Sequence, residues 1–246
     1  MSLAAYFYRR ACCASFLCMT IFSMTTLGEE SFSRCVGDDS SGWTQCHGVL
    51  ESEDIVYEGM FQNGKPHGQG VFVAKDGTKY VGNFDGGLKH GEGELFFGVD
   101  HPLSGSKYRG QFSEDLPNGS GVMIFANGSK YKGSFQGGVF HGRGTMIYPN
   151  GDRYQGNFNE GIREGFGVYF YVDGARYEGR WSNDLENGRG RQTYASGGKY
   201  VGNFVDGLPN GEGTYTFSNG VSYRATWENG EPIEDTIETL AEPNSN

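Results

Sequence analysis

Apolar side chains are scarce in this sequence. They make up 36% of its 246 residues, against roughly 45–50% in an ordinary globular domain. A chain with so little leucine, isoleucine and valine cannot build the usual core of packed aliphatic layers. Any core must therefore be built from other side chains.

Basic residues are also few. Twenty Lys and Arg against 30 Asp and Glu give a formal net charge of −10, and only Arg9 and Arg10 stand side by side. Phosphate groups are bound by clustered Lys and Arg, so the charge argues against a nucleic-acid partner. It also does not favour contact with an anionic membrane surface.

Glycine and aromatic residues are abundant instead. The chain has 42 Gly, 18 Phe, 15 Tyr and 3 Trp. Disordered segments lack such an aromatic content, and glycine without a Gly-x-y period is not collagen. Many aromatic rings, many glycines and few aliphatic residues together predict a repetitive β-structure.

The N-terminal segment has the pattern of a secretory signal peptide. Arg9 and Arg10 precede residues 11–27, which carry no charge, and Gly28 is followed by acidic residues. A positive region, an apolar region and small residues at the cleavage site predict a signal peptide over 1–28. The alternative is an uncleaved anchor, although 17 residues form a helix of only about 26 Å. A cytosolic protein is the third alternative.

The cysteines agree with export. Removal of residues 1–28 would leave only Cys35 and Cys46. In an oxidising compartment they are expected to form one disulfide, worth about 3 kcal/mol. The alternative is two free thiols in a cytosolic protein. Zinc is not expected, because two cysteines and the nearby His47 fall short of four ligands.

A tripeptide Tyr-x-Gly recurs along the chain. Successive copies lie 23 residues apart, except for one interval of 28 that contains five extra residues around 98–102. The tyrosines are Tyr57, Tyr80, Tyr108, Tyr131, Tyr154, Tyr177 and Tyr200, with a degenerate eighth copy at Tyr223. Repeats of this length indicate a stack of identical supersecondary units.

Each unit reads as a β-hairpin. Tyr, Gly and Phe occupy positions 1, 3 and 5 and so share one face of the first strand. Residues such as 62–67 then form a turn, the second strand opens with Gly-x-Gly, and an Asn-Gly or Asp-Gly turn such as Asn127-Gly128 follows. About sixteen strands spaced 4.8 Å apart would make one antiparallel sheet of roughly 75 Å.

The first strands predict an aromatic face that is either the core or a binding surface. We expect its rings to lie on the glycines of neighbouring strands, because a flat ring can cover a bare backbone. Whether the later aromatics Phe125, Tyr148 and Tyr171 join this face depends on the turns. The face comprises Tyr57, Phe61, Tyr80, Phe84, Tyr108, Phe112, Tyr131, Phe135, Tyr154, Phe158, Tyr177, Trp181, Tyr200, Phe204, Tyr223 and Trp227.

The unit resembles the MORN repeat (membrane occupation and recognition nexus) at its Tyr, Gly, Phe, Gly-x-Gly and final Gly. The array over 57–230 lies between an N-terminal cap at 29–56 and an acidic cap or tail at 231–246. Its copies are 57–79, 80–107, 108–130, 131–153, 154–176, 177–199 and 200–222, with a partial copy at 223–230. The resemblance implies an elongated sheet with a protein-interaction or scaffolding role.

Some copies depart from the pattern. Ala225 replaces the first glycine of the last copy, so this copy is expected to end the sheet. Trp181 and Trp227 replace Phe, while Asp115 and Asp184 stand where other copies have Gly.

Catalytic and metal sites are not predicted. His67, His90 and His141 recur before Gly-x-Gly, but equivalent turns would lie roughly 9–10 Å apart, too far to share a zinc ion. No phosphate-binding loop or nucleophile motif occurs, so we expect no cofactor and no enzyme activity. The segments 29–56 and 231–246 are too short for a catalytic domain. Ile233, Ile237 and Leu240 predict an amphipathic cap on the sheet edge or, alternatively, belong to a disordered tail.

These patterns predict an all-β, exported, non-catalytic MORN-type array that binds protein partners of unknown identity. Pairing of sheet edges would give a homo-oligomer. The alternative function is a membrane-associated tether held by residues 11–27, and a hydrolase is a remote third. Secretion would allow glycosylation at two acceptor sequences, Asn118-Gly-Ser and Asn127-Gly-Ser.

Overall fold

The computed structural model describes residues 33–37 and 39–241. The predicted signal peptide therefore lies outside the described residues. Within them, the secondary structure is 19 β-strands and two short 3₁₀ helices, which confirms the predicted all-β fold. The strands of the array are β3 Ile55–Gln62, β4 Lys65–Ala74, β5 Lys79–Asp85, β6 Leu88–Phe96, β7 Lys107–Ser113, β8 Leu116–Ile124, β9 Lys130–Gln136, β10 Val139–Ile147, β11 Arg153–Asn159, β12 Ile162–Phe170, β13 Arg176–Ser182, β14 Leu185–Thr193, β15 Lys199–Val205, β16 Leu208–Thr216 and β17 Ser222–Glu228.

Shorter elements flank the array. The N-terminal ones are β1 Ser33–Arg34, the 3₁₀ helix Ser40–Gly42 and β2 Cys46–Glu51. The C-terminal ones are β18 Glu231–Pro232, the 3₁₀ helix Glu234–Thr236 and β19 Glu238–Ala241.

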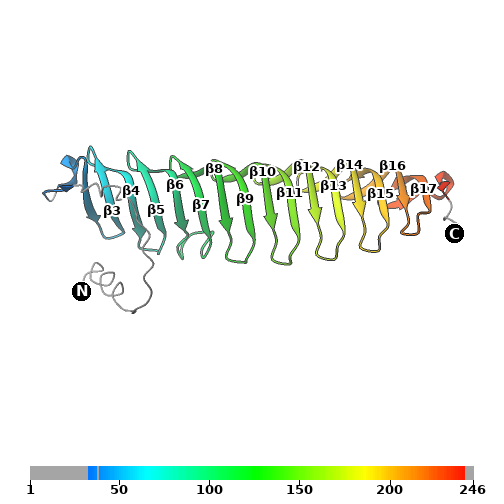
Figure 1. Ribbon diagram of the computed structural model, residues 1–246, viewed down its shortest axis with the longest axis horizontal. Coiled ribbons are helices and arrows are strands. Elements are labelled where there is room, and N and C mark those ends of the chain that lie inside the picture. The colour runs from blue at the N-terminus through cyan, green and yellow to red at the C-terminus, as the bar shows by residue number, and fades with distance from the viewer. Residues whose placement is uncertain (1–32, 38, 242–246) are drawn as a thin grey trace, which may run out of the picture. The chain divides into compact units, whose positions relative to one another are not determined.

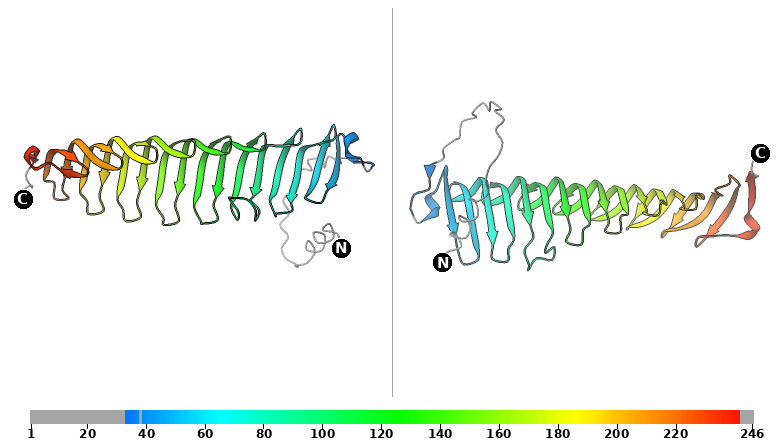
Figure 2. Two further views of the ribbon diagram at one scale, coloured as in Figure 1. Left: turned by 180° about the vertical axis from the view of Figure 1, so that it is seen from behind. Right: turned by 60° about the horizontal axis from the view of Figure 1, so that its bottom comes forward.

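The strands form one sheet in chain order. From β2 to β18 each strand pairs antiparallel with the next one, for example β11 with β12 and β12 with β13. Strand β1 lies parallel to β2 at one end, and β19 also pairs with β17 at the other. Figure 1 shows the resulting ribbon of strands, which curl over along one long edge. The twist of the ribbon is visible in Figure 2.

The turn within each repeat is tighter than the sequence suggested. Asn63 and Gly64 have φ angles of 51° and 73°, so a two-residue turn with two positive φ angles connects β3 and β4. The predicted turn over 62–67 was too long. The second strand already begins at Lys65, and Pro66 lies opposite Phe61.

The two glycines of each Gly-x-Gly serve different purposes. The first, for example Gly165, has a positive φ of 78° next to the place where the register of the hairpin shifts. It lies in a β-bulge in which residues 164–166 of β12 face the single residue Asn157 of β11. Its positive φ favours glycine, and the bulge bends the strand. The same positive φ recurs at Gly68, Gly91, Gly119, Gly142, Gly188 and Gly211.

The second glycine makes room for a tyrosine ring. Gly167 lies directly opposite Gly156, and a Cβ on Gly167 would fall 2.5 Å from Cε2 of Tyr154. The ring therefore lies flat across the glycine pair. Its hydroxyl donates a hydrogen bond to the carbonyl oxygen of Asn157 at 3.0 Å. The same bond to the residue three positions on is made by Tyr57, Tyr80, Tyr108, Tyr131, Tyr177 and Tyr200.

The ring at position 5 packs edge-on between two tyrosines. Phe158 meets Tyr154 of its own repeat at 5.1 Å and Tyr131 of the preceding repeat at 5.2 Å, with interplanar angles of 87° and 89°. Such edge-to-face pairs are favourable. They link one repeat to the next in a continuous row. We expected rings such as Phe158 to cover the glycines, but the tyrosines do so.

The last copy shows what happens when the glycine is missing. Ala225 lies opposite Gly213, where each earlier copy has a glycine pair. Tyr223 is only partly buried and stacks parallel to Trp227, with an interplanar angle of 16°. The methyl group of Ala225 stands where earlier copies leave room for the tyrosine ring, and the ring of Tyr223 takes a different position.

The N-terminal cap imitates half a repeat. Gly48 on β2 lies opposite Gly59, as the second glycine of a repeat would. The ring of Trp43 covers Gly48 as a tyrosine ring does in the repeats, since a Cβ on Gly48 would fall 2.7 Å from it. Cys35 and Cys46 are joined as a disulfide, with their Cα atoms 5.0 Å apart.

The C-terminal segment lies on the sheet edge, as a cap would, but it pairs there as strand and does not form amphipathic helical turns. It forms a single 3₁₀ turn and then β19, which pairs with β17. So short a segment is marginal as a helix, whereas the backbone of β17 offers it hydrogen bonds. Ile233, Ile237 and Leu240 remain 40–48% exposed.

Replacing Phe158 by alanine should destabilise its repeat by about 3–5 kcal/mol, because a buried ring shared by two tyrosines is lost. Replacing Asn157 by alanine, one residue away, should change the free energy of unfolding by less than about 0.5 kcal/mol. Urea unfolding and local hydrogen exchange measure both. Equal effects would contradict the assignment of the faces.

Candidate interaction surface

The aromatic face is the core of the molecule. Fifteen of the sixteen rings predicted to share it are at most 6% exposed, and Tyr223 is the exception. The later rings Phe125 and Tyr148 pack against this core on the same side. Buried rings are not available to a partner, so the candidate surface lies elsewhere.

Two aspartates that replace glycine in the turns bind cations of the preceding repeat. Asp115 Oδ1 accepts hydrogen bonds from the backbone nitrogen of Lys89 at 2.9 Å and from its Nζ at 3.1 Å. Asp184 Oδ1 accepts from the backbone nitrogen and Nε of Arg163, both at 2.9 Å. The sequence showed that Asp115 and Asp184 replace glycine. Their partners could be found in the sequence only because Lys89 and Arg163 occupy the same position in their repeats.

A cluster of polar side chains lies on the aromatic face around Arg163 and Asp184. The guanidinium of Arg163 stacks on Trp181 at 4.2 Å. Glu186 lies opposite Trp181 and is 9% exposed, and the hydroxyl of Tyr171 donates to its Oε1 at 3.4 Å. Burial raises the pKa of Glu186 to about 7. Sequence analysis missed this buried carboxyl group, since other repeats have proline, lysine, phenylalanine or arginine there.

Metal-binding residues do not come together in the described part of the chain. No three His, Cys, Asp or Glu side chains gather there as a metal site would require. His67 instead lies 3.3 Å from Asp85 on the next hairpin.

The two glycosylation sequons lie in different settings. Asn118 is exposed but belongs to β8 itself, three residues after the turn. Asn127 is exposed in the turn between β8 and β9, where its Oδ1 accepts a hydrogen bond from the nitrogen of Ser129. Ser129 is only 7% exposed.

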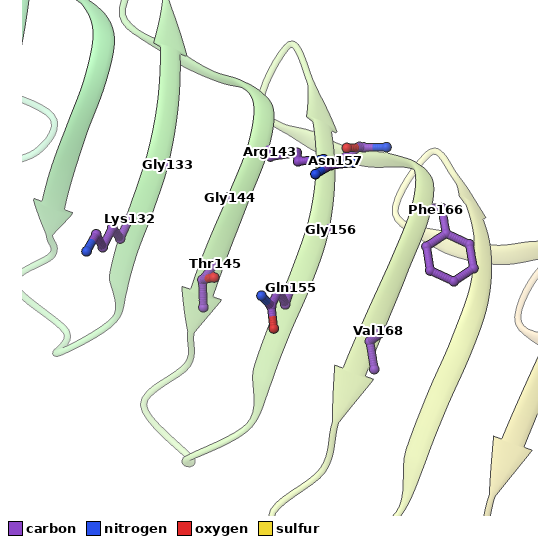
Figure 3. Close-up of a pocket in the computed structure, with 10 residues that line it drawn as sticks. All are labelled: Lys132, Gly133, Arg143, Gly144, Thr145, Gln155, Gly156, Asn157, Phe166 and Val168. Carbon is purple, nitrogen blue, oxygen red and sulfur yellow. The ribbon is translucent and has the colours of Figure 1, made fainter.

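The opposite face of the sheet, which we call the outer face, carries the side chains at even positions of each first strand and their cross-strand neighbours. A hollow of about 620 Å³ lies on it between β9 and β12. Figure 3 shows its two rows of side chains, with bare glycine backbone between them. The lining residues are Lys132, Gly133, Arg143, Gly144, Thr145, Gln155, Gly156, Asn157, Phe166 and Val168. A second hollow of about 260 Å³ continues the same arrangement around Gly190, Gly202 and Gly213.

Basic residues gather on the outer face. One precedes each first-strand tyrosine from the second to the seventh repeat, and the others line the two rows beside the glycines. The register places there Lys79, Lys107, Arg109, Lys130, Lys132, Arg143, Arg153, Arg176, Arg180, Arg189, Arg191, Lys199 and Arg224. These 13 residues are more than half of the 20 Lys and Arg in an acidic chain.

Comparison with known proteins agrees with this architecture. The family description of the MORN repeat matches seven segments, 57–79, 80–98, 108–130, 131–153, 154–176, 177–199 and 200–222. These segments cover more than half of the chain, and the chain belongs to the MORN repeat family. The partial copy at 223–230 is not among the matched segments.

One curated protein matches over a short stretch, and two solved structures align with the chain at low identity. Alsin of Rattus norvegicus and of Homo sapiens is 48% identical over 42 residues, which are 17% of this chain and 2% of alsin. The G-box domain of the microcephaly protein CPAP has a TM-score of 0.48 at 11% identity, covering 80% of this chain and 99% of that domain. The TCP domain of Drosophila melanogaster SAS-4 has a TM-score of 0.37 at 10% identity over 62% of this chain and 85% of that one. In the part of the chain that the structure describes, no helix has the length and hydrophobicity needed to span a bilayer.

Replacing Glu186 by glutamine should change how stability depends on pH. The pKa of Glu186 is about 7 in the folded chain against 4.5 as its ordinary value, so the folded state binds the extra proton between these pH values. Stability of the wild type should fall as pH rises through this window, by up to about 3 kcal/mol, and the variant should lack the fall. Thermal unfolding from pH 4.5 to 8 measures it.

The matched control is Glu212→Gln, which removes an exposed carboxyl group from the outer face. Parallel pH profiles of wild type and Glu186→Gln would show that Glu186 is not the titrating group.

Proposed function

We propose that this chain is a non-catalytic scaffold that binds protein partners through the side chains exposed on its sheet. The observation that carries the proposal is the division of the repeat into fixed and variable positions. Tyrosine, phenylalanine and the glycines are fixed because they form the core. Repeat arrays commonly use their extended surfaces for binding.

The variable positions have the diversity that recognition requires. The middle residue of Gly-x-Gly occupies the same place on the outer face in every repeat but differs in charge, size and polarity. In order along the sheet it is Gln69, Glu92, Ser120, Arg143, Phe166, Arg189 and Glu212. One rigid backbone thus displays a different chemical group at each step of about two strand spacings, or roughly 10 Å.

Cross-linking mass spectrometry of the full chain, purified with its associated proteins, tests the scaffold function. We expect a complex of fixed stoichiometry with cross-links to lysines of the array. A chain that is isolated without partners and that turns over a substrate would overturn the proposal.

We further propose that the chain is exported. Arg9, Arg10 and the uncharged residues 11–27 support this, as does the pairing of Cys35 with Cys46, because disulfides persist in oxidising compartments.

The native protein should therefore lack residues 1–28, should resist alkylation at Cys35 and Cys46, and should carry glycan on Asn118 or Asn127. Asn127 is the preferred acceptor because it lies in an exposed turn. Intact mass with and without glycosidase, followed by peptide mapping, measures all three. A chain that keeps residues 1–28 with two free thiols and no glycan would contradict export, and its recovery in the membrane fraction would favour a tether.

A further inference from the structure

We propose that the middle of the outer face binds an extended polypeptide segment rich in aspartate and glutamate. This rests on the proposed scaffold function and adds to it the binding face and the chemistry of the partner. The face in question, which we call the basic strip, runs from Arg109 on β7 to Arg191 on β14.

The charge of the basic strip is opposite to that of the chain. In the two rows beside the glycines, six side chains are cationic and exposed, namely Arg109, Lys132, Arg143, Arg180, Arg189 and Arg191. The register places one acid among them, Glu178, and it is engaged by Arg176 and Arg191 at 2.9 Å each. The rows therefore carry a net charge of +5, six cations less one anion, within a chain of charge −10.

The strip has limits. Glu92 and Glu94 precede it on β6, and Glu212 follows it on β16. Along one long edge, exposed acids such as Glu114 and Glu160 lie in the turns within the repeats, whereas the other long edge carries the Lys or Arg that precedes the first-strand tyrosine from the second to the seventh repeat. Acidic rims at both ends and along one long edge repel a broad anionic surface but not a single chain that lies within them. A bilayer or a nucleic-acid duplex would meet the rims, so the charge pattern favours a polypeptide.

The width of the strip also fits one chain. Its two rows are two residues apart along each strand, roughly 7 Å, and bare glycine backbone lies between them. A bound segment can thus sink between the rows, as at the hollow of Figure 3. Eight strands span about 34 Å, the length of about ten residues in an extended chain.

Apolar groups in the strip supply contacts beyond charge. Phe166 is 55% exposed at the edge of the hollow, close to Val168. Arg153 and Arg176 both stack on Phe170, at 4.2 Å and 5.3 Å, which holds these two guanidinium groups in place on the outer face. An acidic segment with interspersed apolar residues would match both kinds of group.

The test uses the full chain and a fluorescent twelve-residue glutamate peptide, with a twelve-residue glutamine peptide as the neutral probe. Binding is measured by fluorescence anisotropy at low and at physiological salt. The strip variant combines Arg143→Gln, Arg180→Gln and Arg189→Gln. Its matched control combines Arg34→Gln, Lys65→Gln and Lys75→Gln, which removes the same charge from exposed residues outside the strip.

The wild type should bind the glutamate peptide and not the glutamine peptide. The strip variant should lose roughly tenfold or more in affinity, while the control variant should lose much less. Native circular dichroism and hydrogen exchange of both variants check that the sheet is intact. Equal losses in the two variants would overturn the proposal, because binding would then follow net charge rather than the strip.

Oligothymidine and vesicles containing phosphatidylserine distinguish other anionic partners. If either probe binds more strongly than the glutamate peptide, and the strip variant loses that binding, the partner is a nucleic acid or a membrane and the polypeptide proposal is overturned. Absence of peptide binding from a chain that still forms a cross-linked protein complex would refute this inference and leave the scaffold function standing.

Discussion

A tyrosine ring lying across a pair of opposed glycines is the contact on which this structure depends. Glycine in a strand is normally a weakness, because it has high conformational entropy and no side chain to pack. Here the missing side chains create the flat bed that the ring fills, and the ring's hydroxyl is satisfied by a backbone carbonyl three residues on, as in Tyr154 and Asn157. The core is thus one ring deep, which explains how a single sheet can bury its apolar face with so few aliphatic residues.

The division of labour between the faces follows from this contact. The residues at odd positions of each first strand form the core, and a bulge glycine such as Gly165 bends the second strand. The outer face is left without structural duty, so its residues can vary from repeat to repeat. In this chain most of the basic residues lie on the outer face, while many acids lie in the turns. A single sheet therefore combines a rigid, repetitive core with exposed side chains that differ from repeat to repeat.

Much of the fold could be predicted, because its cause is local and periodic. The spacing of Tyr-x-Gly and the Asn-Gly turns predicted the repeats, the hairpins and the residues that share the aromatic face. Whether this face is the core was left open by the sequence and is answered by the burial of its rings. The turn over 62–67 was predicted too long because Asn63, Gly64 and Pro66 are all typical turn residues, although only Asn63 and Gly64 form the turn and Pro66 lies in β4. The basic strip was missed for another reason: Arg143 and Arg180 lie 37 residues apart, and only the register of four strands brings them to one row. Trp43 over Gly48 carries no repeat signal at all.

The most direct test of the ring-on-glycine contact is a double-mutant cycle between Gly167→Ala and Tyr154→Leu, read out by urea unfolding and by hydrogen exchange of the amides in β11 and β12. A methyl group at Gly167 collides with the ring of Tyr154 and should cost roughly 1–3 kcal/mol in the wild-type background. Once the ring is gone, the same methyl group should cost almost nothing, so the two changes should be coupled by a comparable free energy. Additive effects, with the alanine equally harmful in both backgrounds, would show that the glycine is needed for a reason other than the ring and would contradict the account.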